Sequence, residues 1–322
     1  MSPDRVVRST PMADDLDRRI LELLDQASER FDQKDWPAAA PLYRSILALD
    51  PARASCWHDL GIATKHLKLW EECRSANRRA LALAPDDEGA AWNLGIAGTA
   101  LSDWTAARDG WRAAGIELPT GDGPPEMSLG PVPIRVANDS APEVVWCRRI
   151  DPARAIVVSV PTADSARRYH DLVLHDGSRN GDRLLDGVHV PVFDELEVLA
   201  PSAFSTYAAR IEVDGPEDVT ALETLVEGAG GMSEDWTANV QLLCRACSEG
   251  SPDSRAHDHS AEAAWSPSRT LGIASEGDEA RVHALLSRWM GGRDRGVFRR
   301  FVSPRRRALV SLQRVVVGTP GA

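Results

Sequence analysis

The sequence has few cysteines, no long apolar run and no excess of basic residues. Five cysteines at irregular spacing are too few for a disulfide framework, which favours a reducing compartment, and we expect the cytoplasm. No stretch is long and apolar enough to cross a bilayer, and the first dozen residues lack the apolar centre of a signal peptide. The phosphate-binding and hydrolase motifs G-x-x-x-x-G-K, G-x-S-x-G and H-E-x-x-H are also missing. These absences argue against a membrane-spanning protein and against the enzyme classes that those motifs identify.

Length and composition are those of an ordinary globular protein with two or three domains. The 322 residues are 43% hydrophobic and 26% charged, which allows a buried core without disulfides. The formal net charge of −11 argues against general nucleic-acid binding by the whole chain. The charge is uneven, however, because nine arginines and a single acid, Asp294, lie between Arg288 and Arg314.

Several residue types recur every 34 positions in the N-terminal third of the chain. The recurring sets are Trp36, Trp70 and Trp104; Pro51, Pro85 and Pro119; Ala39, Cys73 and Ala107; and Leu60-Gly61 with Leu94-Gly95. Within each unit the apolar residues follow a helical spacing, and each unit ends at a proline, which stops a helix. Asp35 and Asp103 precede the second helices and can cap them, whereas the middle turn around Leu69 has no capping side chain. The pattern predicts three helical hairpins.

These residues resemble the tetratricopeptide repeat family over residues 14–119. The second unit matches at Trp57, Leu60, Gly61, Cys73, Ala80 and Pro85, and the third at Leu94, Gly95, Ala107, Trp111, Ala114 and Pro119. The first unit is weaker, because Gln26 stands where the family has leucine. The resemblance implies an all-α array over residues 14–118, in which hairpins stack to bury their apolar faces and the first helices line a groove for a protein or peptide.

By the repeat register, the resemblance places eight residues on that groove. They are Ser28, His58, Asp59, Ile62, His66, Trp92, Asn93 and Ile96. The lysine and asparagine clamp with which some members hold a peptide carboxylate is missing, because Leu24, Ser28 and Asp59 occupy the matching positions. A groove of mixed polarity suits a helix or an extended peptide better. The alternative is that this face docks the second half of the same chain.

The rest of the chain predicts β-rich structure, so the fold class is multi-domain, an all-α array followed by a β-rich and α+β region. Residues 1–13 are expected to be a disordered N-terminus, and the Pro- and Gly-rich residues 119–133 a linker. In residues 134–200, short β-branched runs divided by Asp176-Gly177, Asn180-Gly181 and Asp186-Gly187 predict a small all-β unit, such as a barrel. Residues 201–322 predict an α+β unit with strands near 207–213, 239–243 and 308–317, and helices near 216–229 and 279–290.

One group of residues in the second half has the chemistry of a metal site. Cys244, Cys247, His257 and His259 have the spacing C-x2-C-x9-H-x-H. Two thiolates and two imidazoles suit tetrahedral zinc, and a site filled by four protein ligands is structural rather than catalytic. Inert cysteines beside a solvated histidine pair are one alternative, and a redox C-x-x-C pair is another.

The sequence therefore predicts a cytoplasmic adaptor that binds a partner protein through the groove and carries a structural zinc ion. It favours recognition over catalysis. A first rival is an enzyme whose activity lies at the Cys/His group or at Cys147, a thiol beside Arg148 and Arg149. A second rival is a nucleic-acid adaptor that uses the C-terminal arginines Arg299, Arg300, Arg305, Arg306 and Arg307. The preferred interpretation of those arginines is that they pair with the protein's own acidic surface.

Overall fold

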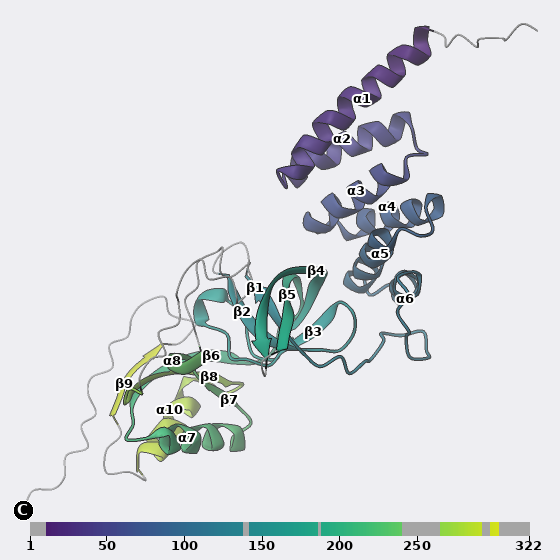
Figure 1. Cartoon of the computed structure of the whole chain (residues 1–322). Helices are drawn as coiled ribbons and strands as arrows, with labels where there is room; N and C mark the ends of the chain where they lie inside the picture. The colour runs from purple at the N-terminus through teal and green to yellow at the C-terminus, as the bar shows by residue number, and fades with distance from the viewer. Residues whose placement is uncertain (1–10, 138–141, 186–187, 240–264, 292–296, 303–322) are drawn as a thin grey trace, which may run out of the picture. The chain divides into compact units, whose positions relative to one another are not determined.

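The chain divides into two compact units, Met1–Met127 and Ser128–Ala322, in the computed structural model (Figure 1). The structure describes residues 11–137, 142–185, 188–239, 265–291 and 297–302. The predicted zinc ligands, the predicted strand at 308–317 and the arginines at 305–307 lie outside the described residues.

The first unit consists of helices that pair as hairpins in chain order (Figure 1). The helices are α1 (Pro11–Asp32), α2 (Trp36–Leu49), α3 (Ala54–His66), α4 (Trp70–Leu83), α5 (Glu88–Ala100) and α6 (Trp104–Ala113). Each helix packs on the next one along the chain, and α3 also packs on α5. The predicted array of three hairpins is confirmed, since the described backbone between Leu16 and Leu118 contains only helices and their connections.

The 34-residue period is present in the backbone as well as in the side chains. Helices α2, α4 and α6 begin at Trp36, Trp70 and Trp104, and the turn before each contains one residue with positive φ. These residues are Lys34, Lys68 and Ser102, with φ of 56°, 57° and 55°. At the middle turn, Lys68 N donates to Lys65 O (3.0 Å) and Leu69 N donates to Thr64 O (2.9 Å). This left-handed closure uses carbonyl groups that would otherwise be unpaired at the end of the first helix.

The helix caps follow the sequence expectations. Asp35 accepts a hydrogen bond from Ala38 N and Asp103 accepts one from Ala106 N, at 3.3 and 3.0 Å. Leu69 provides no side-chain cap for α4, as its residue type predicts. The turn between α3 and α4 is therefore stabilised by its backbone hydrogen bonds and by the acidic residues in the first turn of α4.

The Leu-Gly pair of each later unit marks a close approach between the two helices of a hairpin. A Cβ atom on Gly95 would lie 2.5 Å from the ring of Trp111, and one on Gly61 would lie 2.5 Å from Nδ2 of Asn77. The glycine thus makes room for the large residue at the aromatic position of the second helix. Asn77, the departure from the aromatic pattern, is fully buried and its Oδ1 has no hydrogen-bond partner.

The segment that follows α6 folds back on the array. Arg108 of α6 is 4% exposed and donates to the carbonyls of Gly123 (Nε, 2.7 Å) and Pro119 (Nη1, 2.8 Å). A buried guanidinium needs acceptors, and a Pro- and Gly-rich chain without its own helix offers free carbonyl groups. Much of the segment expected to be a linker therefore contacts the first unit, which extends to Met127, and the first strand already begins at Pro131.

The second unit begins with a closed five-stranded barrel, which agrees with the predicted all-β segment. Its strands are β1 (Pro131–Val136), β2 (Glu143–Arg149), β3 (Arg154–Val157), β4 (Leu172–Leu185) and β5 (Val188–Ala200), with the short helix η1 (Ala163–Ser165) after β3. Each strand pairs antiparallel with the next, and β1 closes the barrel by pairing parallel to β5 at Ile134 and Arg135.

Two expected turns are wrong. Asp176-Gly177 and Asn180-Gly181 lie inside β4, where the register with β5 shifts between Leu174 and Asp182. Bulges place extra residues in one strand of a pair, and Gly181 takes φ of 94° there. The same residue types thus bend a long strand instead of ending it. Strand β1 was not predicted as a separate strand because two of its residues are prolines, which are uncommon within strands.

The remainder of the second unit is a four-stranded antiparallel sheet in the order β7-β8-β6-β9. Its elements are β6 (Ser205–Glu212), α7 (Pro216–Gly228), β7 (Met232–Asp235), the short α8 (Trp236–Asn239), β8 (Ser268–Ser275), α10 (Glu279–Gly291) and β9 (Val297–Val302). Apart from α8, the described order is strand–helix–strand–strand–helix–strand, the ferredoxin-like arrangement. Both expected helices are confirmed. The strand expected at 239–243 is wrong at Asn239, which ends α8, and its other residues lie outside the described part.

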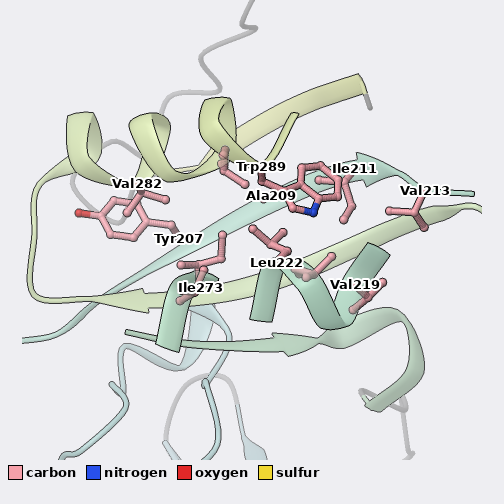
Figure 2. Packing of buried hydrophobic residues seen from close by; sticks show 12 residues of the cluster. Tyr207, Ala209, Ile211, Val213, Val219, Leu222, Ile273, Val282 and Trp289 are labelled. Atoms are coloured by element: carbon pink, nitrogen blue, oxygen red, sulfur yellow. The ribbon is translucent and has the colours of Figure 1, made fainter. Parts of the chain in front are cut away.

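Helices α7 and α10 cover one face of this sheet (Figure 2). Tyr207 and Ile211 of β6 meet Leu222 of α7 and Trp289 of α10 in a buried apolar core. The barrel and the sheet are joined by hydrogen bonds at Val160, whose N–H donates to Glu234 and whose carbonyl accepts from the Trp236 indole, both at 2.9 Å.

A histidine is fully buried in the barrel. The Nδ1 atom of His175 donates to the carbonyl of Asp176 (3.0 Å), and the ring stacks on Phe193 at a centroid distance of 5.2 Å. Burial disfavours the charged ring and lowers the pKa of His175 from 6.5 to about 4.

We expect this histidine to make the second unit sensitive to acid. Between pH 6.5 and about 4, the unfolded chain binds a proton at His175 that the folded chain does not bind, so stability falls as the pH falls through that window. The loss is up to about 3 kcal/mol. The difference in free energy of unfolding between His175→Gln and the parent chain should therefore change between pH 7 and pH 4. The measurement is chemical denaturation at both pH values, with the exposed His170→Gln as the matched control. A difference that is equal at both pH values would contradict the assigned burial.

Candidate partner-binding surface

The candidate binding surface lies on the first helices of the hairpins, α1, α3 and α5. Residues 34 positions apart occupy equivalent places on these helices, and steps of three or four residues put them on one side of each helix. We call this the first-helix face. Its columns are Leu21, Ser55 and Gly89; Leu24, His58 and Trp92; Asp25, Asp59 and Asn93; Ser28, Ile62 and Ile96; and Asp32, His66 and Ala100.

His58 of α3 is held by the next hairpin. Its Nδ1 lies 2.8 Å from Oδ2 of Asp87, whose other oxygen caps α5 by accepting from Ala90 N at 2.9 Å. The ring also packs against Gly89, where an added Cβ atom would lie only 2.6 Å from Cε1 of His58. The ring remains half-exposed with a fixed orientation, because one side chain links the cap of α5 to the surface of α3.

Asp59 is held from the preceding hairpin. It accepts a hydrogen bond from the hydroxyl of Tyr43, a residue of α2 that is 2% exposed. Burial raises the pKa of Asp59, although the bond to Tyr43 opposes that shift. Burial also raises the pKa of Tyr43, and the charge of Asp59 adds to this shift. The carboxylate is therefore a half-buried, oriented acceptor rather than a freely solvated charge.

Two aromatic contacts fix further members of the face. His66 is exposed and stacks on Trp36 with ring centroids 4.5 Å apart and an interplanar angle of 9°. Trp92 is half-buried and meets Trp111 edge to face at 5.1 Å. Ser28 is exposed and Ile62 is half-buried. Most of the residues that the repeat register selects are thus accessible, and several are held in place.

The other two selected residues are not accessible. Asn93 and Ile96 of α5 are 5% and 1% exposed. Sequence reasoning also missed members of the face on α1, since Leu21 is 60% exposed and Asp25 and Asp32 are exposed as well. The 34-residue period was the signal that could have identified these α1 residues, because Asp25 and Asp32 lie one period before Asp59 and His66. The exposed part of the face lies on α1 and α3 and continues to Trp92.

The structure leaves the predicted zinc site untested. Cys244, Cys247, His257 and His259 all lie in residues 240–264, outside the described part. Within the described ranges, no group of three or more His, Cys, Asp or Glu side chains is placed to hold a metal ion. Of the C-terminal arginines, Arg299 and Arg300 belong to β9, while Arg305, Arg306 and Arg307 lie beyond the described residues.

The suggestion that Cys147 is a reactive thiol is wrong. Its side chain is fully buried between the strands of the barrel, with other apolar residues around it. Burial raises the pKa of Cys147, the opposite of what a nucleophilic thiolate requires. The neighbouring Arg149 places its guanidinium over the ring of Phe193, 5.5 Å from the centroid. Cys147 is therefore a small apolar core residue.

Comparisons with known proteins find similarity to solved structures. No protein-family model matches the chain, and no curated protein matches it. The TPR2B domain of yeast Sti1 in its pHsp70 complex is 22% identical, with a TM-score of 0.28, over 30% of this chain and 78% of that one. The Arabidopsis OM64 TPR domain is 18% identical, with a TM-score of 0.29, over 30% and 80%. The first TPR of Spaghetti (RPAP3) bound to the HSP90 peptide SRMEEVD is 22% identical, with a TM-score of 0.28, over 30% and 77%.

These TM-scores are too low to support a conclusion about fold or function.

No helix of the described ranges combines the length and apolar character needed to cross a bilayer. The helices themselves carry the conclusion, because their hairpin pairing, their starts at 34-residue intervals and their periodic left-handed turns all agree. Residues 11–113 have the tetratricopeptide-type fold.

Proposed function

We propose that this chain is a cytoplasmic protein-interaction adaptor whose first-helix face binds a helix or peptide of a partner protein. One observation carries the proposal: His58, Asp59 and His66 are accessible and are held in fixed orientations by neighbouring helices. Side chains that are already ordered lose less conformational entropy when a partner binds, so such positions favour recognition.

The chemistry of the face narrows the kind of partner. Accessible apolar side chains at Leu21, Ile62 and Trp92 alternate with the polar side chains described above. None of the five columns contains lysine or arginine, so a peptide carboxylate would find no clamp. An amphipathic segment with apolar residues three or four positions apart is complementary to this surface.

The test uses peptides selected from a phage-displayed library on the full-length chain. A selected peptide should bind with an affinity measurable by titration calorimetry, and Leu21→Ser or His66→Ala should each weaken it about tenfold. For Leu21 that loss corresponds to the burial of one large apolar group, and for His66 to the loss of the ring that stacks on Trp36. Leu83→Ser on α4 is the matched control, because Leu83 is also exposed, at 45%, but belongs to a second helix.

The control should change the affinity by less than twofold, with the helical circular dichroism of all variants unchanged. Peptides that lose equal affinity in Leu83→Ser and in Leu21→Ser would contradict binding at the first-helix face.

We also propose a structural zinc ion at Cys244, Cys247, His257 and His259, on the strength of the donor set and its spacing. Four protein ligands would close the coordination sphere, so the ion would serve folding and not catalysis. Elemental analysis of the purified chain should give one zinc per molecule, and Cys244→Ser should reduce that ratio to near zero. A parent chain without stoichiometric zinc would remove the proposal and leave the adaptor function untouched.

A further inference from the structure

Asp59 is a half-buried carboxylate of the first-helix face that has no lysine or arginine partner within the described part of the chain. The donor that binds it is the hydroxyl of Tyr43, and the neighbouring His58 is engaged by Asp87 at 2.8 Å. The carboxylate has therefore lost part of its hydration without gaining a cation. Burial raises the pKa of Asp59, which agrees with an uncompensated charge.

Other carboxylates of the array show how such a charge is usually compensated. Glu72 binds Arg44 and Asp103 binds Arg74, at 2.6 and 2.7 Å, and both arginines belong to second helices. The columns of the first-helix face contain neither lysine nor arginine. A cation at Asp59 would therefore come from a bound partner.

The next member of the same column also has unused hydrogen-bonding capacity. Asn93 of α5 is 5% exposed, and its side chain makes no hydrogen bond within the described part of the chain. Side-chain amides at this degree of burial are nearly always bonded. The amide atoms of Asn93 are not among the fully enclosed polar atoms that lack a partner, so a bound group can reach them. Since α3 packs on α5, Asp59 and Asn93 are neighbours in the column.

Apolar side chains flank Asp59 on the same face. Ile62 follows it by three residues on α3, and Leu24 belongs to a neighbouring column on α1; both are half-buried. The methylene stem of a lysine or arginine packs along apolar surface of this kind while its charged end reaches a carboxylate. The surroundings of Asp59 thus suit a long basic side chain better than a short or an acidic one.

We propose that the partner segment carries a lysine or arginine whose charged end binds Asp59, and that the amide of Asn93 is hydrogen-bonded to the same segment. The inference rests on the proposed function and specifies its partner, because the amphipathic segment would have to be basic where it crosses α3. The cation relieves the uncompensated charge of Asp59, so the contact contributes to affinity as well as to selectivity.

The experiment repeats the library selection on the full-length chain and on its Asp59→Asn variant. This substitution removes the charge but keeps the side-chain shape and an oxygen that can accept from Tyr43. Peptides selected on the parent chain should share a lysine or arginine at a fixed distance from their apolar residues, and peptides selected on the variant should not. The control Asp109→Asn removes an exposed carboxylate from α6 and should select the same basic peptides as the parent.

A thermodynamic cycle then measures the contact itself. In the tightest peptide, the shared arginine is replaced by citrulline, or the shared lysine by acetyl-lysine, which removes the charge and keeps the stem. This change should weaken binding to the parent chain about tenfold and to Asp59→Asn less than twofold, because the contact is already lost there. Exchanging lysine for arginine in the peptide tells which of the two the site prefers.

Asn93→Leu tests the second contact, because leucine has a similar volume and no hydrogen-bonding group. It should weaken the unmodified peptide about fivefold, the loss of one hydrogen bond, with the circular dichroism unchanged. Unchanged affinity in this variant would overturn the role of Asn93.

Two results would overturn the role of Asp59: selected peptides that share no basic residue, or equal losses on charge removal with the parent chain and with Asp59→Asn. If such peptides still lose affinity in Leu21→Ser, they bind the first-helix face, and the proposed function stands without this inference. A selection that yields no peptide sensitive to Leu21→Ser or His66→Ala would contradict both.

Discussion

A helical hairpin has one apolar side that it cannot bury alone, and the first unit depends on this constraint. Stacking satisfies it only if adjacent helices approach closely, which explains the alanines and glycines at the contacts, such as Gly95 against Trp111. The same stacking repeats every 34 residues, so it aligns equivalent residues of α1, α3 and α5 in columns. The proposed binding surface is therefore a consequence of how the core packs.

Polar and charged side chains link neighbouring hairpins of the array in more than one way. Between second helices, carboxylates and arginines are paired, as in Arg44 with Glu72, and these pairs link neighbouring hairpins. On the first-helix face the polar groups are instead oriented by neighbours of a different kind: a cap for His58, a hydroxyl for Asp59 and an aromatic ring for His66. Each of these groups therefore has a fixed orientation at an accessible or half-buried position of the face.

The parts that the sequence could predict are those in which a local pattern and its packing partner repeat. The hairpins, the caps at Asp35 and Asp103, the barrel and helices α7 and α10 are of this kind. Predictions failed where one residue type has two structural uses. Asn180-Gly181 is a turn signal in many hairpins but lies at a bulge inside β4, and the prolines of β1 resembled linker residues. Whether Asn93 is accessible depends on its packed neighbours, which the repeat register does not specify.

Native-state hydrogen exchange of Gly95→Ala tests the central claim, that the hairpins are stable only as a stack. The added methyl group would lie 2.5 Å from Trp111 and must displace it, so the third hairpin loses its packing. The account predicts that the free energy of exchange falls for amides in α1 to α4 as well as in α5 and α6, because the units support one another. Unchanged protection in α1 to α4, with loss confined to α5 and α6, would contradict it.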